Sequence, residues 1–409
     1  MIENSPILLS DIRGYSRLAV EATIGLTNVV ETMHHNIARA PGILGAPTQE
    51  PTKGITGLVY QIIRGVTRLV GGGIDVALAQ LVPQLSHGTS SAEREAVLAA
   101  LNGVLGDHLA AGENPLAIPM RLRRDGQPLE LTRKALAAAI PRPSRKVLML
   151  AHGLCMNDLQ WRRKGHDHGA ALAADAGFTQ VYLHYNSGLH ISTNGRAFAD
   201  LIEALLEVWP APVEELVIIG HSMGGLVSRS ACHYGKAAGH NWLRRLRKII
   251  FLGAPHHGAP LERGGNWLNV ILSVSPYTVA LAHLGKIRSA GITDLRYGSL
   301  LDEEWKYRDR FAHSKDRRRV VPLPDGVQCY AVGASISRAS ALGKRFLGDG
   351  LVPLSSALGR HADPRRNLSF PESQQWIGYG MKHLDLLARR EVYEHMKQWL
   401  SCPSWRESR

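Results

Sequence analysis

The stretch LVIIGHSMGGL, residues 216–226, joins an apolar run to a glycine-rich turn. The first four residues are typical of a buried strand, and the residues after the turn have the apolar spacing of a helix. Gly220 and Gly224 flank Ser222 in a Gly-x-Ser-x-Gly pattern, which fits a turn too tight for side chains beside the serine. A serine exposed at such a strand-to-helix turn can attack an acyl carbon. The sequence therefore predicts Ser222 as a nucleophile.

The segments around this stretch alternate between strand and helix patterns. Continuous apolar runs predict strands at residues 147–151, 181–185, 216–219, 249–252 and 327–332. Helices are predicted at residues 198–209, 225–238 and 389–400. This alternation indicates an α/β fold with a mainly parallel sheet flanked by helices. In such sheets, functional residues collect at the carboxyl ends of the strands.

A serine nucleophile needs amide donors for the negative charge that develops on the substrate oxygen. One donor is normally the amide of the residue after the nucleophile, here Met223. A second normally comes from a loop after an earlier strand. The strand at residues 147–151 is followed by His152-Gly153-Leu154, so Leu154 is the second predicted oxyanion-hole residue.

The acid and the base are expected to follow the serine in that order along the chain. Asp349 lies between two glycines after the strand at residues 327–332, and His383 lies in a loop before the last helix. We predict that His383 accepts the serine proton and that Asp349 orients its ring. The alternatives are His361 or His395 as base, and Asp302, Asp363 or Asp385 as acid.

Three motifs together resemble those of α/β-hydrolase fold lipases and esterases: residues 220–225 (GHSMGG), 252–260 (LGAPHHGAP) and 348–353 (GDGLVP). The nearest branch looks like the bacterial relatives of the GPI inositol-deacylase-type lipases. The resemblance covers about residues 145–400 and implies Ser222, Asp349 and His383 as the catalytic triad. Some similar secreted lipases bind calcium through an aspartate placed like Asp385. Its partner is not recognisable here, so we expect no metal and interpret Asp385 as a helix-start cap. A serine hydrolase needs no cofactor, and we expect none.

Two further segments have their own patterns. An insertion at about residues 260–324 is longer than a sheet connection needs, and its apolar residues predict a helical cap over an acyl pocket, with ordinary packed helices as the alternative. Residues 1–144 are predicted to be a helical extension that ends in a short β-hairpin around Asp125-Gly126, followed by a catalytic domain at 145–402. Within the extension, residues 55–85 resemble a packed helical pair or a membrane-surface anchor.

The composition is that of a folded globular chain, with 44% hydrophobic and 20% charged residues among 409. The net charge is +13, and residues 1–144 carry 13 basic and 12 acidic side chains. Nearly all of the excess positive charge therefore lies in residues 145–409. We interpret this excess charge mainly as a solvated basic face, and contact with an anionic lipid surface is the next interpretation. The clusters of basic residues are not interleaved with aromatic residues, as they are in an RNA-binding strand, so we expect no nucleic-acid partner. The four cysteines lack metal or dithiol spacing. We see no signal peptide and no membrane-spanning segment, and expect a cytoplasmic location, with peripheral contact with a membrane as the alternative.

Together these features predict a serine hydrolase of carboxylic esters that acts through an acyl-serine intermediate on medium or long acyl chains. An acyltransferase of the same fold would have the same triad. A non-catalytic lipid-binding scaffold is the alternative outside enzymes. The alcohol moiety, the physiological substrate and the oligomeric state are left open by the sequence.

Overall fold

The structure is a computed structural model that describes residues 13–14, 16–17, 19–20, 92–259, 289–306, 316, 318–337 and 348–401. The chain divides into two compact units. One comprises residues 1–91 and 111–117, and in it the Arg17 guanidinium donates to the carbonyls of Gly112 and Glu113. The other comprises residues 92–110 and 118–409 and contains the sheet with every predicted site residue.

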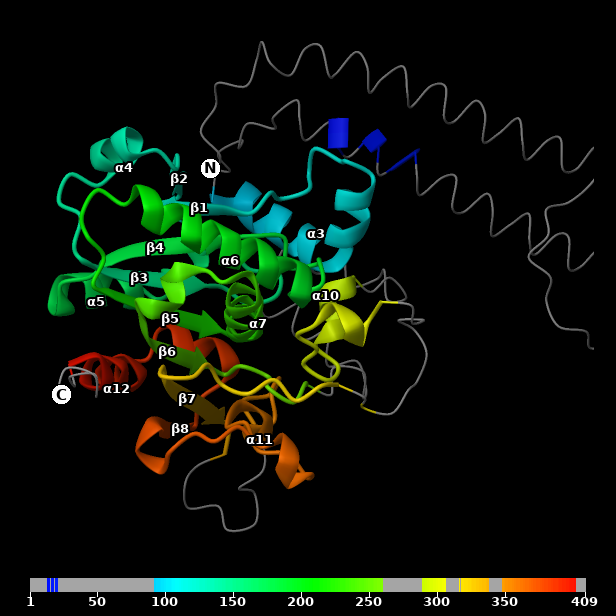
Figure 1. The fold of residues 1–409 in the computed structure, drawn as a ribbon. Coiled ribbons are helices and arrows are strands. Elements are labelled where there is room, and N and C mark those ends of the chain that lie inside the picture. The colour runs from blue at the N-terminus through cyan, green and yellow to red at the C-terminus, as the bar shows by residue number, and fades with distance from the viewer. Residues whose placement is uncertain are drawn as a thin grey trace, which may run out of the picture. The chain divides into compact units, whose positions relative to one another are not determined.

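The second unit is built on an eight-stranded sheet in the order β2-β1-β4-β3-β5-β6-β7-β8 (Figure 1). Neighbouring strands from β4 to β8 are parallel, whereas β1 pairs antiparallel with both β2 and β4. The strands are β1 (Arg121–Arg124), β2 (Gln127–Pro128), β3 (Lys146–Ala151), β4 (Thr179–His184), β5 (Glu215–His221), β6 (Leu246–Leu252), β7 (Gln328–Ser335) and β8 (Gln375–Tyr379).

Helices cover both faces of this sheet (Figure 1). Helices α5 (His168–Ala176) and α12 (Arg390–Ser401) pack together on one face, and α6 (Ile191–Val208) and α7 (Met223–Ala238) pack together on the other. The remaining α-helices among the described residues are α3 (Ala92–Ala111), α4 (Arg133–Ala139), α10 (Ala290–Asp294) and α11 (Leu354–Ala357). Short 3-10 turns occur at η1 (Asp158–Trp161), η2 (Asn241–Arg244), η4 (Asp302–Glu304), η5 (Pro364–Arg366), η6 (Glu372–Gln374) and η7 (His383–Leu387).

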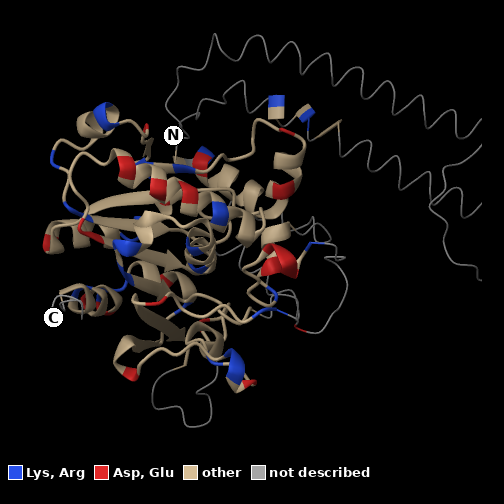
Figure 2. Ribbon diagram, viewed as in Figure 1, with Lys and Arg blue, Asp and Glu red and all other residues tan. Residues whose placement is uncertain are grey.

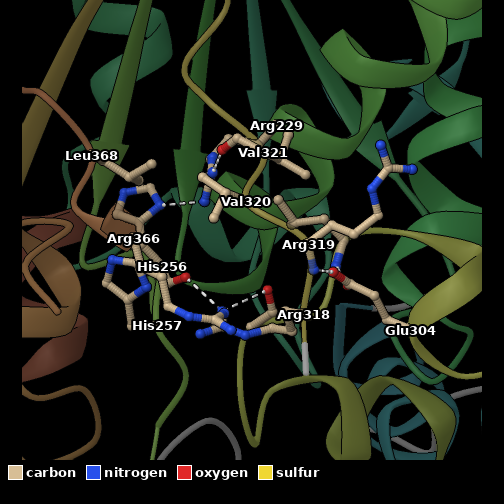
Figure 3. A pocket seen from close by; sticks show the side chains of 12 residues that line it. Arg229, His256, His257, Glu304, Arg318, Arg319, Val320, Val321, Arg366 and Leu368 are labelled. Atoms are coloured by element: carbon tan, nitrogen blue, oxygen red, sulfur yellow. Dashed lines mark hydrogen bonds between the residues drawn. The ribbon is translucent and has the colours of Figure 1, made fainter. Parts of the chain in front are cut away.

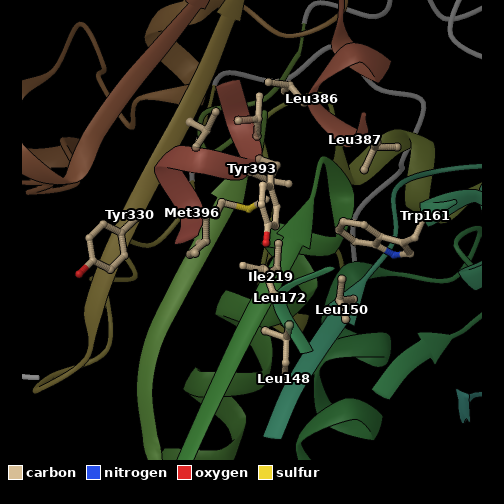
Figure 4. Close-up of a cluster of buried hydrophobic side chains, with 14 of the residues drawn as sticks. Leu148, Leu150, Trp161, Leu172, Ile219, Tyr330, Leu386, Leu387, Tyr393 and Met396 are labelled. Atoms are coloured by element: carbon tan, nitrogen blue, oxygen red, sulfur yellow. The ribbon is translucent and has the colours of Figure 1, made fainter. Parts of the chain in front are cut away.

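The alternation of side chains along the strands explains why both faces are apolar. Leu150, Ile219 and Leu252 belong to a buried cluster with Leu172 of α5 and Met396 of α12 (Figure 4). The strand residues that alternate with these three face the opposite layer of helices. Phe251 of β6 is an example, because a β-carbon added to Gly225 of α7 would lie 3.1 Å from its ring. Strands that are buried on both faces need continuous apolar runs, which is the pattern from which they were predicted.

Helix α3 packs against the loops that follow β3 and β4. A β-carbon added to Gly103 would lie 2.2 Å from Sγ of Cys155, and one added to Gly106 would lie 1.8 Å from Oδ1 of Asn186. The Asn186 side chain also donates to the Gly106 carbonyl, at 2.8 Å. Both glycines are therefore required by the close approach of the helix backbone to these loops.

The predicted α/β class, with a mainly parallel sheet flanked by helices, is confirmed. All five predicted strands and all three predicted helices are present, and the hairpin around Asp125-Gly126 is β1–β2. Most ends shift by one to three residues, but the helix predicted at 198–209 begins seven residues earlier, as α6 (Ile191–Val208). Strand β8 was not predicted, because it is a partly exposed edge strand that begins with a polar residue and lacks a continuous apolar run.

The predicted domain boundary at residue 144 stays a prediction. Strand β1, which comes before residue 144, belongs to the same sheet as β3–β8. The apolar segment at 55–85 and the apolar part of the predicted cap, residues 260–288, lie outside the described residues. In the described ranges, no helix is long and apolar enough to cross a membrane.

Basic and acidic residues are interspersed over the described elements (Figure 2). The basic residue Lys248 is not at the surface: it is buried in β6, and its Nζ donates to the carbonyls of Trp399 and Leu400 at 3.0 and 3.3 Å. This lysine therefore caps the carboxyl end of α12 and adds nothing to a basic face.

Candidate active site

The strand order determines where a site can form. Strand β3 lies between β4 and β5 in the sheet. The connection after β3 leads to β4 on one side, whereas the connection after β5 leads to β6 on the other, so the connections that follow these two neighbouring strands run in opposite directions. A crevice forms at the carboxyl ends of two such strands. The loop His152-Gly153-Leu154 follows β3, and Ser222 follows β5. A β-carbon added to Gly153 would lie 3.1 Å from Cβ of Ser222, so these two loops are in contact.

Ser222 has the backbone conformation of a tight strand-to-helix turn, with φ 53° and ψ −123°. This left-handed conformation costs a non-glycine residue about 1–3 kcal/mol. Two hydrogen bonds maintain it: the Ser222 amide donates to the Leu252 carbonyl at 2.9 Å, and the Gly225 amide donates to the Ser222 carbonyl at 3.0 Å. The turn therefore holds the serine at the first turn of α7, next to the end of β6.

The glycines on both sides of Ser222 are required by backbone contacts. A β-carbon added to Gly220 would lie 2.6 Å from Cα of Gly225, and one added to Gly224 would lie 2.2 Å from the carbonyl oxygen of Ala151. Neither neighbour is a flexible side chain that could move away. The spacing of the motif thus follows from the approach of α7 to the ends of β3 and β5.

We expect Gly224→Ala to lower kcat/KM for an ester substrate by at least about 100-fold, because the added methyl would push the start of α7 away from β3 and separate the predicted oxyanion donors. Gly235→Ala is the matched control, since it lies three turns further along α7 and its nearest new contacts, at 3.0 Å or more, are with the Trp242 side chain. Ester hydrolysis by purified variants with matched circular dichroism measures both. Activity of Gly224→Ala within threefold of the wild type would contradict this explanation of the turn.

The two predicted oxyanion donors lie in these same loops. Met223 is the first residue of α7, so its amide belongs to the N–H groups that have no partner within the helix. Leu154 is buried in the loop after β3. Both residues are where the sequence predicted them, and their role as donors stays a prediction.

His152 orders the loop that carries Leu154. Its Nδ1 lies 2.9 Å from the Gly153 carbonyl and its Nε2 accepts from the Tyr185 amide at 3.4 Å, which assigns the Nδ1–H tautomer. Complete burial lowers the pKa of His152 to about 3, so the ring stays neutral. The Tyr185 hydroxyl donates to the His152 carbonyl at 2.8 Å, and the two rings stack. This pair was not predicted from the sequence, because only the pairing of β3 with β4 brings the two residues together.

His383 and Asp349 form a direct hydrogen bond. Nδ1 of His383 donates to Oδ2 of Asp349 at 2.6 Å, and both side chains are almost fully buried. The other carboxylate oxygen, Oδ1, accepts from the amides of Leu351 and Val352 at 3.0 and 2.8 Å. A carboxylate held in this way keeps the imidazole in the Nδ1–H tautomer and leaves Nε2 as a proton acceptor.

The His383 ring lies beside the serine turn. Its centroid is 4.7 Å from that of His221, the residue before Ser222. A β-carbon added to Gly253 would lie 3.1 Å from the His383 ring, and Gly253 follows Leu252, whose carbonyl accepts from the Ser222 amide. The structure therefore brings the three predicted triad residues to the same edge of the sheet.

The alternative acids and bases have other partners. Asp302 pairs with Arg196 and Lys306, Asp363 pairs with Arg365, and the His395 ring lies tilted against that of Trp376, with the centroids 4.5 Å apart. Asp385 accepts from the Lys382 amide at 3.0 Å and pairs with Lys164, as expected of a cap.

Other polar groups near the predicted site make structural contacts. Ser187 Oγ accepts from the Cys155 amide, and the Asn194 side chain donates to the Asn186 carbonyl. Burial raises the pKa of Cys155 to about 12, so this thiol stays protonated. Across the described ranges, no group of three or more metal-ligating side chains lies close together.

Together, the sheet and the serine turn define the α/β-hydrolase fold. Residues 144–322 match the family model described as the PGAP1-like alpha/beta domain, which confirms the resemblance that the motifs indicated. The match contains Ser222, Leu154 and Met223 and ends before Asp349 and His383. A comparison with curated protein sequences finds no match.

Solved structures similar to this chain include lipases and an esterase. The mature form of a Bacillus licheniformis lipase has 16% identity and a TM-score of 0.40, covering 69% of this chain and 98% of its own. Aspergillus fumigatus lipase B has 12% identity and a TM-score of 0.43, covering 98% and 86%. An esterase of Pyrobaculum calidifontis has 12% identity and a TM-score of 0.36, covering 63% and 76%.

Proposed function

We propose that the protein is a serine hydrolase of carboxylic esters, with Ser222, His383 and Asp349 as its triad and the amides of Met223 and Leu154 as its oxyanion hole. The observation that supports this most directly is the buried hydrogen bond from His383 Nδ1 to Asp349 Oδ2, 2.6 Å long, beside a serine in a strained strand-to-helix turn. A structural turn alone has no need of a buried imidazole and carboxylate at its side.

The proposed reaction follows from these positions. Ser222 Oγ attacks the acyl carbon while His383 Nε2 takes its proton, and the carbonyl oxygen becomes an oxyanion that the two amides stabilise. His383 returns the proton to the oxygen of the leaving alcohol as the ester bond breaks, which forms the acyl-serine. A water molecule then attacks the acyl carbon, gives its proton to His383, and releases the carboxylic acid as the proton returns to Ser222.

We propose medium or long acyl chains as substrates, on the basis of the apolar side chains between residues 260 and 288. A cap with such side chains is suited to covering an acyl group and excluding water from it.

The test is labelling with a fluorophosphonate followed by intact mass measurement, together with the hydrolysis of p-nitrophenyl esters from acetyl to palmitoyl. We expect one adduct per chain, mapped to Ser222, and a maximum of kcat/KM at a medium or long chain. Turnover that rises when an alcohol is added, with the acyl group recovered as a new ester, would instead indicate acyl transfer. Absence of both labelling and turnover, with and without liposomes, would refute the proposal.

A further inference from the structure

The loop that carries Leu154, residues 152–156 and here called the oxyanion loop, contacts a helix outside the residues that match the family model. The match begins at residue 144, whereas the helix is α3, which ends at Ala111. Residues 92–110 of α3 belong to the same compact unit as the oxyanion loop. The contacts between them bear on how the predicted donor is aimed.

The peptide bond between Gly153 and Leu154 has a fixed direction. The Gly153 carbonyl accepts from the Met156 amide at 3.3 Å, and it lies 2.9 Å from Nδ1 of His152. In a trans peptide the C=O and N–H groups point in opposite directions, so the Leu154 amide points away from both partners. Within the described ranges this amide has no hydrogen-bond partner, which is the condition that an oxyanion donor must meet.

Cys155 gives the oxyanion loop its shape. Its φ is 58°, a left-handed value that residues with a β-carbon rarely adopt. The hydrogen bond from Met156 to Gly153 closes a β-turn, and a positive φ at the third position of the turn, with none at the second, belongs to type II, where glycine is usual. A cysteine at this position is held against its own preference, so contacts around it must maintain the conformation.

Three contacts hold Cys155, and two of them come from α3. Its amide donates to Oγ of Ser187, in the loop after β4, at 3.0 Å. Its thiol donates to the Ala100 carbonyl of α3, with 3.9 Å between Sγ and the oxygen. A β-carbon added to Gly103 would lie 2.2 Å from Sγ, 2.9 Å from Cα and 3.0 Å from the nitrogen of Cys155. The backbone of α3 therefore lies directly against this residue.

Helix α3 is itself fixed to the sheet and to the segment before α10. Near the start of the helix, Glu95 accepts from Nη1 of Arg123 in β1 at 2.9 Å, and the same nitrogen donates to Asp158 of η1 at 3.0 Å. Further along, the Ser289 hydroxyl donates to the Gly103 carbonyl at 2.6 Å. These side chains are buried, so movement of the helix away from the oxyanion loop would break buried polar contacts, which is costly.

The loop after β6, at the same edge of the sheet, is held in a different way. Figure 3 shows His256 of that loop beside Arg229 of α7 and Arg318. Nη1 of Arg318 donates to the His256 carbonyl at 3.1 Å, and Nη1 of Arg229 lies 3.4 Å from Nδ1 of His256. Both arginines lie within the matched residues 144–322. The oxyanion loop differs, because part of its support comes from a helix before those residues.

We propose that α3 sets the direction of the Leu154 amide by holding Cys155 in its left-handed conformation, which makes Gly103 and Cys155 positioning residues. The inference rests on the proposed function, because the direction of this amide matters only if an oxyanion forms beside Ser222. A change of conformation at residue 155 would open the turn and redirect the amide. Loss of a donor that acts only in the transition state lowers kcat and leaves KM nearly unchanged.

Gly103→Ala tests the proposal, because the added methyl would displace the backbone of Cys155. We expect kcat for the preferred p-nitrophenyl ester to fall at least about tenfold, with KM within about twofold of the wild type. The inhibition constant of an alkyl trifluoromethyl ketone, whose adduct with a serine places an oxyanion in the same hole, should rise by about the same factor as kcat falls.

Gly235→Ala is the matched control for this substitution. It also adds a methyl to a buried helical glycine, but its nearest new contacts are with the Trp242 side chain. Its kcat and its inhibition constant should stay within about threefold of the wild type. Circular dichroism and thermal unfolding curves of both variants establish that the proteins compared are folded.

Two substitutions at residue 155 test the same proposal without adding volume to α3. Glycine adopts a positive φ freely, whereas alanine does not. Cys155→Gly should therefore have a kcat at least about fivefold higher than that of Cys155→Ala, with similar KM values. A role in packing alone predicts the reverse order, because glycine leaves the larger cavity.

Labelling with the fluorophosphonate separates this inference from the proposed function. If the wild type is neither labelled at Ser222 nor active, the proposed function fails and the inference fails with it. If the wild type is labelled and active, a smaller fall of kcat in Gly103→Ala, or an effect on KM alone, overturns only the inference. If Gly103→Ala does not fold, the two Cys155 variants decide, and equal or reversed values of kcat overturn the inference.

Discussion

Ser222→Ala is expected to lower kcat/KM for p-nitrophenyl esters by about 10⁶-fold while the fold is retained. Loss of the nucleophile from a serine triad has an effect of this size, because the remaining groups have nothing to transfer the acyl chain to. The fold should persist because the turn is maintained by the backbone hydrogen bonds of residue 222 to Leu252 and Gly225, which alanine preserves.

The matched control is Ser228→Ala, a second buried serine on α7 whose Oγ donates to the Gly224 carbonyl at 2.7 Å. Its activity should stay within about threefold of the wild type, and it should still take the fluorophosphonate label. Initial rates and intact masses of both variants, with thermal unfolding curves for each, separate loss of the nucleophile from loss of the fold. Labelling of Ser222→Ala at the wild-type rate would show that another residue is the nucleophile.

Asp349→Asn is expected to lower kcat by about 10⁴-fold. The asparagine oxygen can keep the hydrogen bonds from Leu351 and Val352, and its NH₂ group then takes the position of Oδ2 opposite His383. That group donates, so Nδ1 of His383 must accept and its proton moves to Nε2. An imidazole with its proton on Nε2 cannot take a proton from Ser222, so activity falls although the geometry is unchanged.

Asp385→Asn is the control for this substitution, because Asp385 is two residues from His383 but faces Lys164 and the Lys382 amide. Its kcat should stay within about threefold of the wild type. Single-turnover acylation rates over a range of pH measure the effect on the step that needs the base. Near-normal acylation in Asp349→Asn, together with a large loss in Asp385→Asn or Asp302→Asn, would assign the acid to one of those residues.

The parts of the fold that were predictable are those in which the pattern is contiguous. The five buried strands are continuous apolar runs and the helix after Ser222 has a regular apolar stripe, so each could be recognised within a short window. Strand β8 has no such run, because it lies at the edge of the sheet, pairs with one neighbouring strand only and is partly exposed. The packing of α3 on Cys155 and Asn186 was not predictable either, since Gly103 and Gly106 have no local feature that indicates their partners.

The sequence by itself determined the class of fold and the serine turn, because tight turns and buried strands impose their residue types on neighbouring positions. It ranked Asp349 and His383 above their rivals by their positions relative to the predicted strand and the last helix, and left the choice open. The hydrogen bond between them joins residues 34 apart, and it exists because β7 and the segment before α12 end at the same edge of the sheet. The contact of Arg229 of α7 with His256 was also decided by tertiary structure, because it depends on how α7 lies against the loop after β6. Local patterns specify local conformation, whereas the distance between separate segments depends on strand order and helix packing.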